Sequence, residues 1–402
     1  MPRFDDGDLT QVAGDKILEL EISASEEELP DKEFFEQNPP AELFRAGIDR
    51  QLLKLGYPGS LDDPLEKVRF LQDQFQKNEV PPVSNATLTN WITRMTKDGK
   101  PSSPSTKANG RENVFKLCFA LEMNAVETAE FMLKSYLRRP FNYKNTDEAV
   151  YFYCLSNGRR YPDAQRILKS VARARKTIPD ETIDTEQIGQ ELADLRNEND
   201  LIEYLAAHTY TKEQWHHSAQ ERIKKLLERC KELACQELPA VLPGEEPLRA
   251  AEIGNDALLN TIYGFKASVR PGDHGLSAHK NYDFPEVLKN NWIDKQALHN
   301  VVNGKGVSDE VYRKTLILLS FYSFYATLYV QESVSGKERG FNYQSLADEF
   351  EDELDQLLAE AGYLQIYKRN PFDWFILYCA AFPDPLERFR DLIHHFRIDW
   401  NG

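Results

Sequence analysis

Two segments of the chain carry the same polar and aromatic landmarks in the same order, and this repetition constrains the fold more than any other feature. The first segment contributes Ser84, Leu88, Asn90, Arg111, Phe119, Lys144, Asn145, Glu148, Tyr153 and Cys154. The second contributes, with the same spacing inside each block, Asp294, Leu298, Asn300, Arg313, Phe321, Arg369, Asn370, Asp373, Tyr378 and Cys379. Solenoid units recur every ~20–50 residues, so this wider separation predicts two related modules. The alternative is that unrelated amphipathic helices resemble one another.

Apolar residues recur at helical spacing along most of the chain, which predicts an all-α fold. We expect helices within 41–76 and over 85–95, 111–123, 126–137, 146–155, 161–176, 211–238, 315–331 and 350–361. Asp63-Pro64 and Ser84 are suited to begin two of these helices. Stops are expected at Asn157-Gly158, at Pro239–Pro247 and at Gly362. The helix over 315–331 should be buried on most sides.

Composition divides the chain into four parts. Residues 1–41 are expected to form an acidic, poorly ordered arm, in which the alternating run 17–22 is compatible with a strand. Residues 42–176 form helical module A, with a helix-turn-helix-like segment, and residues 283–402 form helical module B. Between them, residues 177–282 are expected to form an acidic helical connector.

Several observations bear on the compartment. The longest uncharged run, 315–331, falls short of the ~20 apolar residues that a membrane-spanning helix needs. The N-terminal sequence MPRFDDGDLTQ is acidic and polar, unlike a secretory signal peptide. Five cysteines are too few and too scattered for a disulfide scaffold, which favours a reducing compartment. We therefore expect a cytoplasmic protein with no membrane partner.

Charge is distributed unevenly along the chain. The formal net charge is −16, yet residues 84–176 carry 17 Lys and Arg against 8 Asp and Glu. The acidic whole disfavours non-specific binding to nucleic acid, but a local basic face can still bind phosphate. The alternative is a chance fluctuation among solvated side chains.

The run SNATLTNWI, the Gly/Lys turn and Pro/Ser-rich loop after it, and RENVFKLCFALEMNAVETAEFML resemble the helix-turn-helix domains of the phage-repressor class (Cro/CI-like, XRE) over about 50 residues. The resemblance implies a recognition helix that is anchored by Leu88, Trp91 and Ile92. Its outer face would contact duplex DNA through Asn85, Thr87, Thr89, Asn90 and Arg94. Phosphate contacts would come from Lys97, Lys100, Lys107 and Arg111. The alternative is a purely structural helical module.

Other candidate sites are weaker. Arg138, Arg139, Arg159 and Arg160 are further candidates for phosphate contact, with solubility as the alternative role. No P-loop, dinucleotide-binding or nucleophile-elbow motif occurs, so we expect no enzyme activity and no cofactor. Adjacent histidines on a helix point about 100° apart, so His216-His217 and His394-His395 favour the surface over a metal site.

Two repeated positions favour a structural role. Cys154 and Cys379 are expected to be buried. We expect Asp373 to cap its helix or to pair with Arg369, and Glu148 and Lys144 to play the same parts in module A.

These patterns predict a non-enzymatic DNA-binding or regulatory protein of bacterial, phage-defence or mobile-element type. Module A would contact DNA, and module B or the helix over 211–238 would support packing or self-association. The alternative is a helical adaptor that binds another protein, and a third interpretation is an enzyme without a recognisable motif. DNA binding would be favoured if seven basic residues share one exposed face: Lys97, Lys100, Arg111, Arg138, Arg139, Arg159 and Arg160. Burial of the helix after Ser84 by other helices would favour the adaptor.

Overall fold

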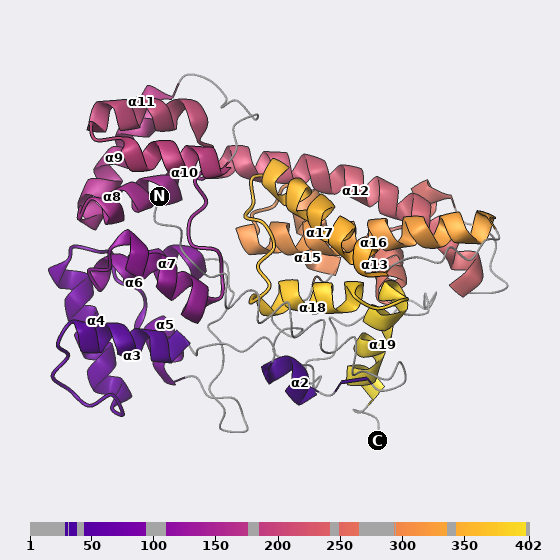
Figure 1. Cartoon of the computed structure of the whole chain (residues 1–402), viewed down its shortest axis with the longest axis horizontal. Helices are drawn as coiled ribbons and strands as arrows, with labels where there is room; N and C mark the ends of the chain where they lie inside the picture. Colours follow the sequence, from indigo (N-terminus) through magenta and orange to yellow (C-terminus); the bar gives the residue numbers. More distant parts are fainter. Residues whose placement is uncertain are drawn as a thin grey trace. The chain divides into compact units, whose positions relative to one another are not determined.

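The computed structural model describes residues 29–30, 32–37, 44–93, 110–175, 185–241, 249–264, 293, 295–335 and 343–398. Within these ranges the regular structure is helical and no strand is present (Figure 1). The predicted all-α fold class is therefore confirmed. None of the described helices is long and apolar enough to cross a membrane.

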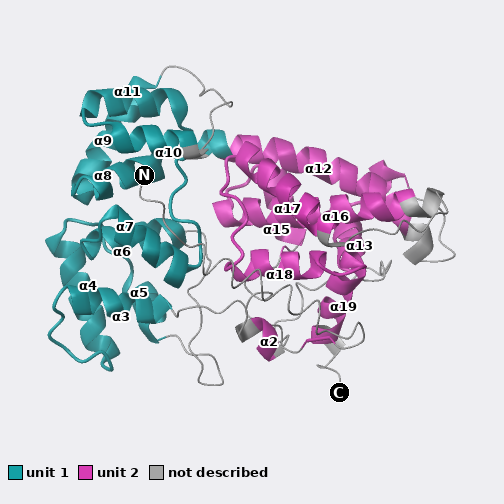
Figure 2. Cartoon of the chain, viewed as in Figure 1, with its two compact units in different colours: residues 1–8, 40–215 teal, residues 9–39, 216–402 magenta. Residues whose placement is uncertain are grey.

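The chain divides into two compact units (Figure 2). Unit 1 contains residues 1–8 and 40–215, and unit 2 contains residues 9–39 and 216–402. This division differs from the predicted one, because the segment 177–282 does not form a separate connector. Its first two helices belong to unit 1, and most of the rest belongs to unit 2.

The described residues of unit 1 form ten helical elements around one apolar core. They are α3 (Phe44–Lys54), α4 (Pro64–Lys77), α5 (Asn85–Thr93), α6 (Gly110–Ala120), α7 (Ala125–Phe131), the π-helical turn η1 (Met132–Tyr136), α8 (Thr146–Ser156), α9 (Tyr161–Ala174), α10 (Thr185–Asp194) and α11 (Glu198–His208).

Local sequence signals explain where several of these helices begin and end. The Asp63 carboxylate accepts hydrogen bonds from the amides of Leu65 and Glu66, at 2.9 and 3.1 Å, and Pro64 is the first residue of α4. A capping box at Asn124 begins α7. Gly158 has φ of +62°, which lets the chain leave α8 in the left-handed conformation that glycine tolerates. The stop expected at Asn157-Gly158 is therefore confirmed.

Unit 2 contains nine described helices. They are α2 (Lys32–Gln37), α12 (Lys212–Val241, in unit 2 from His216 onward), the 3-10 turn η2 (Ala250–Glu252), α13 (Asn255–Ile262), α15 (Lys295–Val302), α16 (Asp309–Ser335), α17 (Tyr343–Glu360), α18 (Pro371–Ala380) and α19 (Pro385–Ile398). Residues 312–319 of α16 are all buried, as expected for this helix. Gly362 follows α17 with φ of +82°, which confirms the predicted stop.

Two expectations need a different account, and a third is not tested. Helix α12 does not end before Pro239 but continues to Val241, within the predicted stop. Proline lacks a backbone N–H, and in the last turn of the helix this costs a single hydrogen bond. Residues 32–37 of the predicted disordered arm form α2, which packs on unit 2 through two phenylalanines described below. The alternating run 17–22 lies outside the described residues.

An arginine–carboxylate clasp, in which one guanidinium binds a carboxylate and two backbone carbonyls, lies at equivalent sequence positions of the two units. In unit 1, the Arg111 guanidinium binds both oxygens of Glu148 at 2.6 and 2.7 Å and donates to the carbonyls of Arg139 and Pro140, each at 3.0 Å. The amide of Asn142 also donates to Glu148, at 2.8 Å. This arrangement fixes α6 against the chain that enters α8.

The clasp of unit 2 repeats these contacts. Arg313 binds both oxygens of Asp373 at 2.7 and 2.8 Å and donates to the carbonyls of Leu364 and Gln365, at 3.2 and 3.1 Å. The amide of Tyr367 donates to Asp373 at 2.9 Å. The four residues that Arg313 or Asp373 contacts here correspond to those of unit 1, because each residue on or before α18 lies 225 positions after its counterpart on or before α8. These repeated contacts support the duplication that we infer from the sequence.

The clasps correct one prediction and confirm another. Local spacing favours Arg369 and Lys144 as partners of the two carboxylates, but the structure pairs them with Arg313 and Arg111 from α16 and α6. The helix caps are instead Asn145 and Asn370, whose side chains accept hydrogen bonds from the amides of the second and third residues of α8 and α18. Cys154 and Cys379 lie on these two helices and are fully buried, as predicted.

Candidate nucleic-acid interface

Helix α5 is anchored to unit 1 by one face. The Ser84 hydroxyl accepts the amide of Thr87 at 3.2 Å, so Ser84 caps the helix as predicted. Leu88, Trp91 and Ile92 are buried, and the Trp91 ring meets Phe44 of α3 at a centroid distance of 5.4 Å. Helices α3 and α4 both pack against α5. The anchoring role expected for these three apolar residues is confirmed.

The opposite face of α5 is polar and uncharged. Asn85 and Asn90 are exposed, whereas Thr87 and Thr89 are half-buried. The Asn85 side chain accepts a hydrogen bond from Gln72 of α4, which orients its amide. The side-chain amide of Asn90 has no hydrogen-bond partner among the described residues. The condition that would have favoured the adaptor, a buried outer face, is therefore not met.

The connection from α4 to α5 departs from the tight turn of the resemblance. Residues 78–84 span seven positions, against about 3–4 in a helix-turn-helix. Glu79 adopts φ of +54°, and Val80 and Val83 are buried beneath the two exposed prolines. This connection is therefore anchored at both ends, and it still leaves α5 packed beside α4.

Three predicted phosphate contacts, Lys97, Lys100 and Lys107, lie outside the described residues, and so does Arg94 of the predicted outer face. They belong to the segment 94–109, which carries four basic residues and one acidic residue and joins α5 to α6. Positive charge therefore follows α5 directly in the sequence.

Three of the remaining arginines are half-buried in unit 1, so the described residues do not gather all the predicted basic side chains on one exposed face. Arg111 is committed to the clasp with Glu148 and to two carbonyl oxygens. Arg138 and Arg139 are half-buried, and the carbonyl of Arg139 belongs to the same clasp. We therefore leave these three side chains out of the interface.

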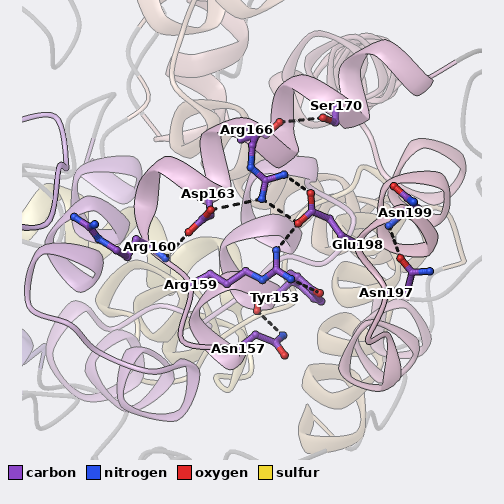
Figure 3. A network of polar contacts seen from close by, with 10 residues as sticks. All are labelled: Tyr153, Asn157, Arg159, Arg160, Asp163, Arg166, Ser170, Asn197, Glu198 and Asn199. Atoms are coloured by element: carbon purple, nitrogen blue, oxygen red, sulfur yellow. Dashed lines mark hydrogen bonds and ion pairs between the residues drawn. The ribbon is translucent and has the colours of Figure 1, made fainter.

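Arg159 and Arg160 lie in the network drawn in Figure 3. Arg159 and Arg166 both bind the carboxylate of Glu198 at the start of α11. Hydrogen bonds from Arg166 and then Arg159 lower the pKa of Glu198 to about 2, against the opposing effect of burial. Arg159 also lies over the ring of Tyr153, 5.2 Å from its centroid. This side chain therefore ties α11 to α8 and α9.

Arg160 remains more accessible. Its guanidinium binds Glu79 at 2.8 Å, and its side chain is 52% exposed. Helix α9 adds two exposed basic residues, Lys169 and Arg173, one helical turn apart, with no ion-pair partner among the described residues. The sequence could have indicated Lys169 and Arg173, because they are four residues apart and each lies two positions after a buried residue, Ile167 or Val171.

The described residues contain no group of three or more His, Cys, Asp and Glu side chains that could hold a metal ion. His216 is paired with Asp309 rather than with a second histidine. Cys230 is buried and donates to the carbonyl of Leu319 at 3.4 Å.

No protein-family model, curated protein or solved structure matches the chain. The resemblance to phage-repressor-type domains therefore stays a prediction, and function is argued from the site alone.

Proposed function

We propose that unit 1 binds duplex DNA, with α5 in the major groove and the basic segment 94–109 against the phosphates. The observation that carries the proposal is the contrast between the two faces of α5. One face is fixed in the core by Leu88, Trp91 and Ile92, and the other presents short, uncharged polar side chains to solvent.

Such a face suits the reading of base edges. The major groove is about 12 Å wide and admits one helix, and an asparagine amide can pair with both N6 and N7 of adenine. Asn90 is exposed and has no hydrogen-bond partner among the described residues, so its amide is available for such a contact. A purely structural helix would gain nothing from an exposed face without charge, because charged residues serve solubility better.

Phosphate binding would come mainly from the segment after α5. Arg94, Lys97, Lys100 and Lys107 supply four positive charges within 14 residues. Neutralising phosphates releases condensed counterions, and this release gives most of the affinity of non-specific DNA binding. The net charge of −16 opposes it, so we expect measurable binding at low ionic strength.

The test compares two asparagines that the repeat makes equivalent, Asn90 in α5 and Asn300 in α15. Asn90→Asp places a carboxylate on the proposed contact face, whereas Asn300→Asp makes the same change in net charge in unit 2. Asparagine and aspartate have similar helix propensities, so both variants should fold.

Binding is measured by the fluorescence anisotropy of a labelled mixed-sequence duplex with the full chain at about 50 mM salt. We expect Asn90→Asp to weaken binding at least ~10-fold, since one base contact provides about 1–3 kcal/mol. The affinity of Asn300→Asp should stay within ~2-fold of wild type, because Asn300 belongs to unit 2 and not to the proposed contact helix. Equal losses in both variants, or no binding by the wild type, would overturn the proposal.

A further inference from the structure

The short helix α2 covers an aromatic surface on unit 2. The Phe35 ring lies 5.4 Å from Phe375, 5.5 Å from Tyr378 and 5.7 Å from Phe396. The Phe34 ring lies 5.7 Å from the rings of both Trp374 and Tyr378. We call the surface formed by Trp374, Phe375, Tyr378 and Phe396 the α18–α19 aromatic site.

Helix α2 occupies this site in the manner of a bound peptide. It has six residues, and helices of this length are not stable alone in water. It is separated from α18 by more than 300 residues of sequence, and at residue 40 the chain passes from unit 2 into unit 1. Two adjacent phenylalanines therefore hold it, as anchor side chains hold a helix in a groove.

Helix α2 leaves one hydrogen-bonding group of the site unsatisfied. The indole Nε1 of Trp374 is buried and has no hydrogen-bond partner among the described residues. A buried donor without an acceptor is destabilising, and most buried donors in folded proteins are paired. A ligand that kept the two rings and brought an acceptor within reach of Nε1 would satisfy this donor.

We propose that the α18–α19 aromatic site is a docking site for a helical segment of a partner protein, and that α2 occupies it in cis until the partner displaces it. The partner segment presents two adjacent phenylalanines, as α2 does, and a carboxylate, amide or hydroxyl oxygen that accepts the indole N–H of Trp374. The proposal is independent of DNA binding by unit 1. It describes the chemistry of a partner for the alternative adaptor function, which the sequence alone does not specify.

The first experiment opens the site in the full chain by the double substitution Phe34→Ala and Phe35→Ala. The probe is a fluorescein-labelled peptide of residues 29–37, LPDKEFFEQ. Wild-type protein should bind it at least ~10-fold more weakly than the variant, because a tethered segment competes at a millimolar effective concentration. A peptide with both phenylalanines changed to alanine should not bind.

Two further variants separate site opening from general loosening. Phe324→Ala truncates a ring that packs on Phe350, away from α2, and should leave the site closed to the peptide. Phe34→Ala alone removes only the half-buried ring and serves if the double variant does not fold. If the folded Phe34→Ala and Phe35→Ala double variant does not bind the peptide, or if wild type binds it as tightly as that variant does, the proposal is overturned.

The second experiment tests the indole N–H. The peptide positions that are neither phenylalanine nor already glutamate are changed in turn to glutamate: Leu29, Pro30, Asp31, Lys32 and Gln37. At least one change should tighten binding to the opened protein by ~10-fold, roughly the effect of one buried hydrogen bond, and Trp374→Phe should abolish that gain. If no position gains, the acceptor assigned to the partner is refuted. A concentration-dependent dimer that the double variant loses would identify a second copy as the occupant and refute the assignment to a partner protein.

Discussion

Replacing Asp373 by asparagine should strongly destabilise unit 2. The Asp373 side chain is 0% exposed and accepts hydrogen bonds from both terminal nitrogens of Arg313 and from the amide of Tyr367. Asparagine keeps the shape but removes the negative charge, which leaves the Arg313 cation buried with two carbonyl acceptors. Removing one partner of a buried ion pair costs about 3–5 kcal/mol, a large part of the ~5–15 kcal/mol that stabilises a typical domain.

Removing both partners should be less damaging than removing one. In Arg313→Met with Asp373→Leu no charge is left buried, and the remaining cost comes from backbone groups. The carbonyls of Leu364 and Gln365 and the amide of Tyr367 lose their partners. Water can form hydrogen bonds with some of these groups, so we expect the free energy of unfolding to fall by about 1–3 kcal/mol.

Urea unfolding followed by circular dichroism measures these losses, and hydrogen exchange reports on α8 and α18 separately. Asp373→Asn should lower the midpoint of thermal unfolding of unit 2 by roughly 6–20 °C. Glu148→Gln is the matched variant and should expose α8 to exchange. A loss below about 1 kcal/mol in Asp373→Asn would mean that the clasp behaves like a surface ion pair, and would refute its assigned role.

Two other predictions concern single groups. Arg166 and Arg159 lower the pKa of Glu198 to about 2, whereas the pKa of glutamate in the unfolded chain is near ~4.3. The ionised Glu198 therefore stabilises the fold fully above pH ~4.3, and this stabilisation is lost as the pH falls towards 2. Because its partners are partly exposed, Glu198→Gln should cost only about 1 kcal/mol at pH 7 and nothing near pH 2 in urea unfolding, and a pH-independent cost would contradict this. Of the five cysteines only Cys235 is not buried, so native protein should react with a thiol reagent faster at Cys235 than at the other four, although burial raises the pKa of Cys235 too. Burial raises the pKa of Cys154 to about 12, and mass spectrometry that finds Cys154 labelled as fast as Cys235 would contradict its buried packing.

Helix boundaries with a local chemical cause could be predicted from the sequence. Asp63-Pro64 and Ser84 begin helices, and Gly158 and Gly362 end them, because each effect depends on side chains within a few residues. The apolar anchor of α5 follows in the same way from its spacing. All of these features need only nearest neighbours.

Contacts between distant positions could not be predicted in this way. The repeat pattern singles out both Arg111 and Glu148, but nothing local says that residues 37 positions apart form one clasp. The same holds for Phe34, whose place against Trp374 depends on how unit 2 closes. For the candidate interface, composition marks the basic block but does not tell which arginines are occupied, as Arg159 is by Glu198.

The salt dependence of DNA binding tests the proposed function most directly. The anisotropy titration is repeated with the full chain over a series of salt concentrations, for wild type and for the triple substitution of Arg94, Lys97 and Lys100 by alanine. Each phosphate contact contributes about −0.9 to the slope of log K against log salt. The account predicts a slope in the triple variant that is shallower than wild type by roughly 2–3. An unchanged slope, or no binding by the wild type at about 50 mM salt, would contradict it.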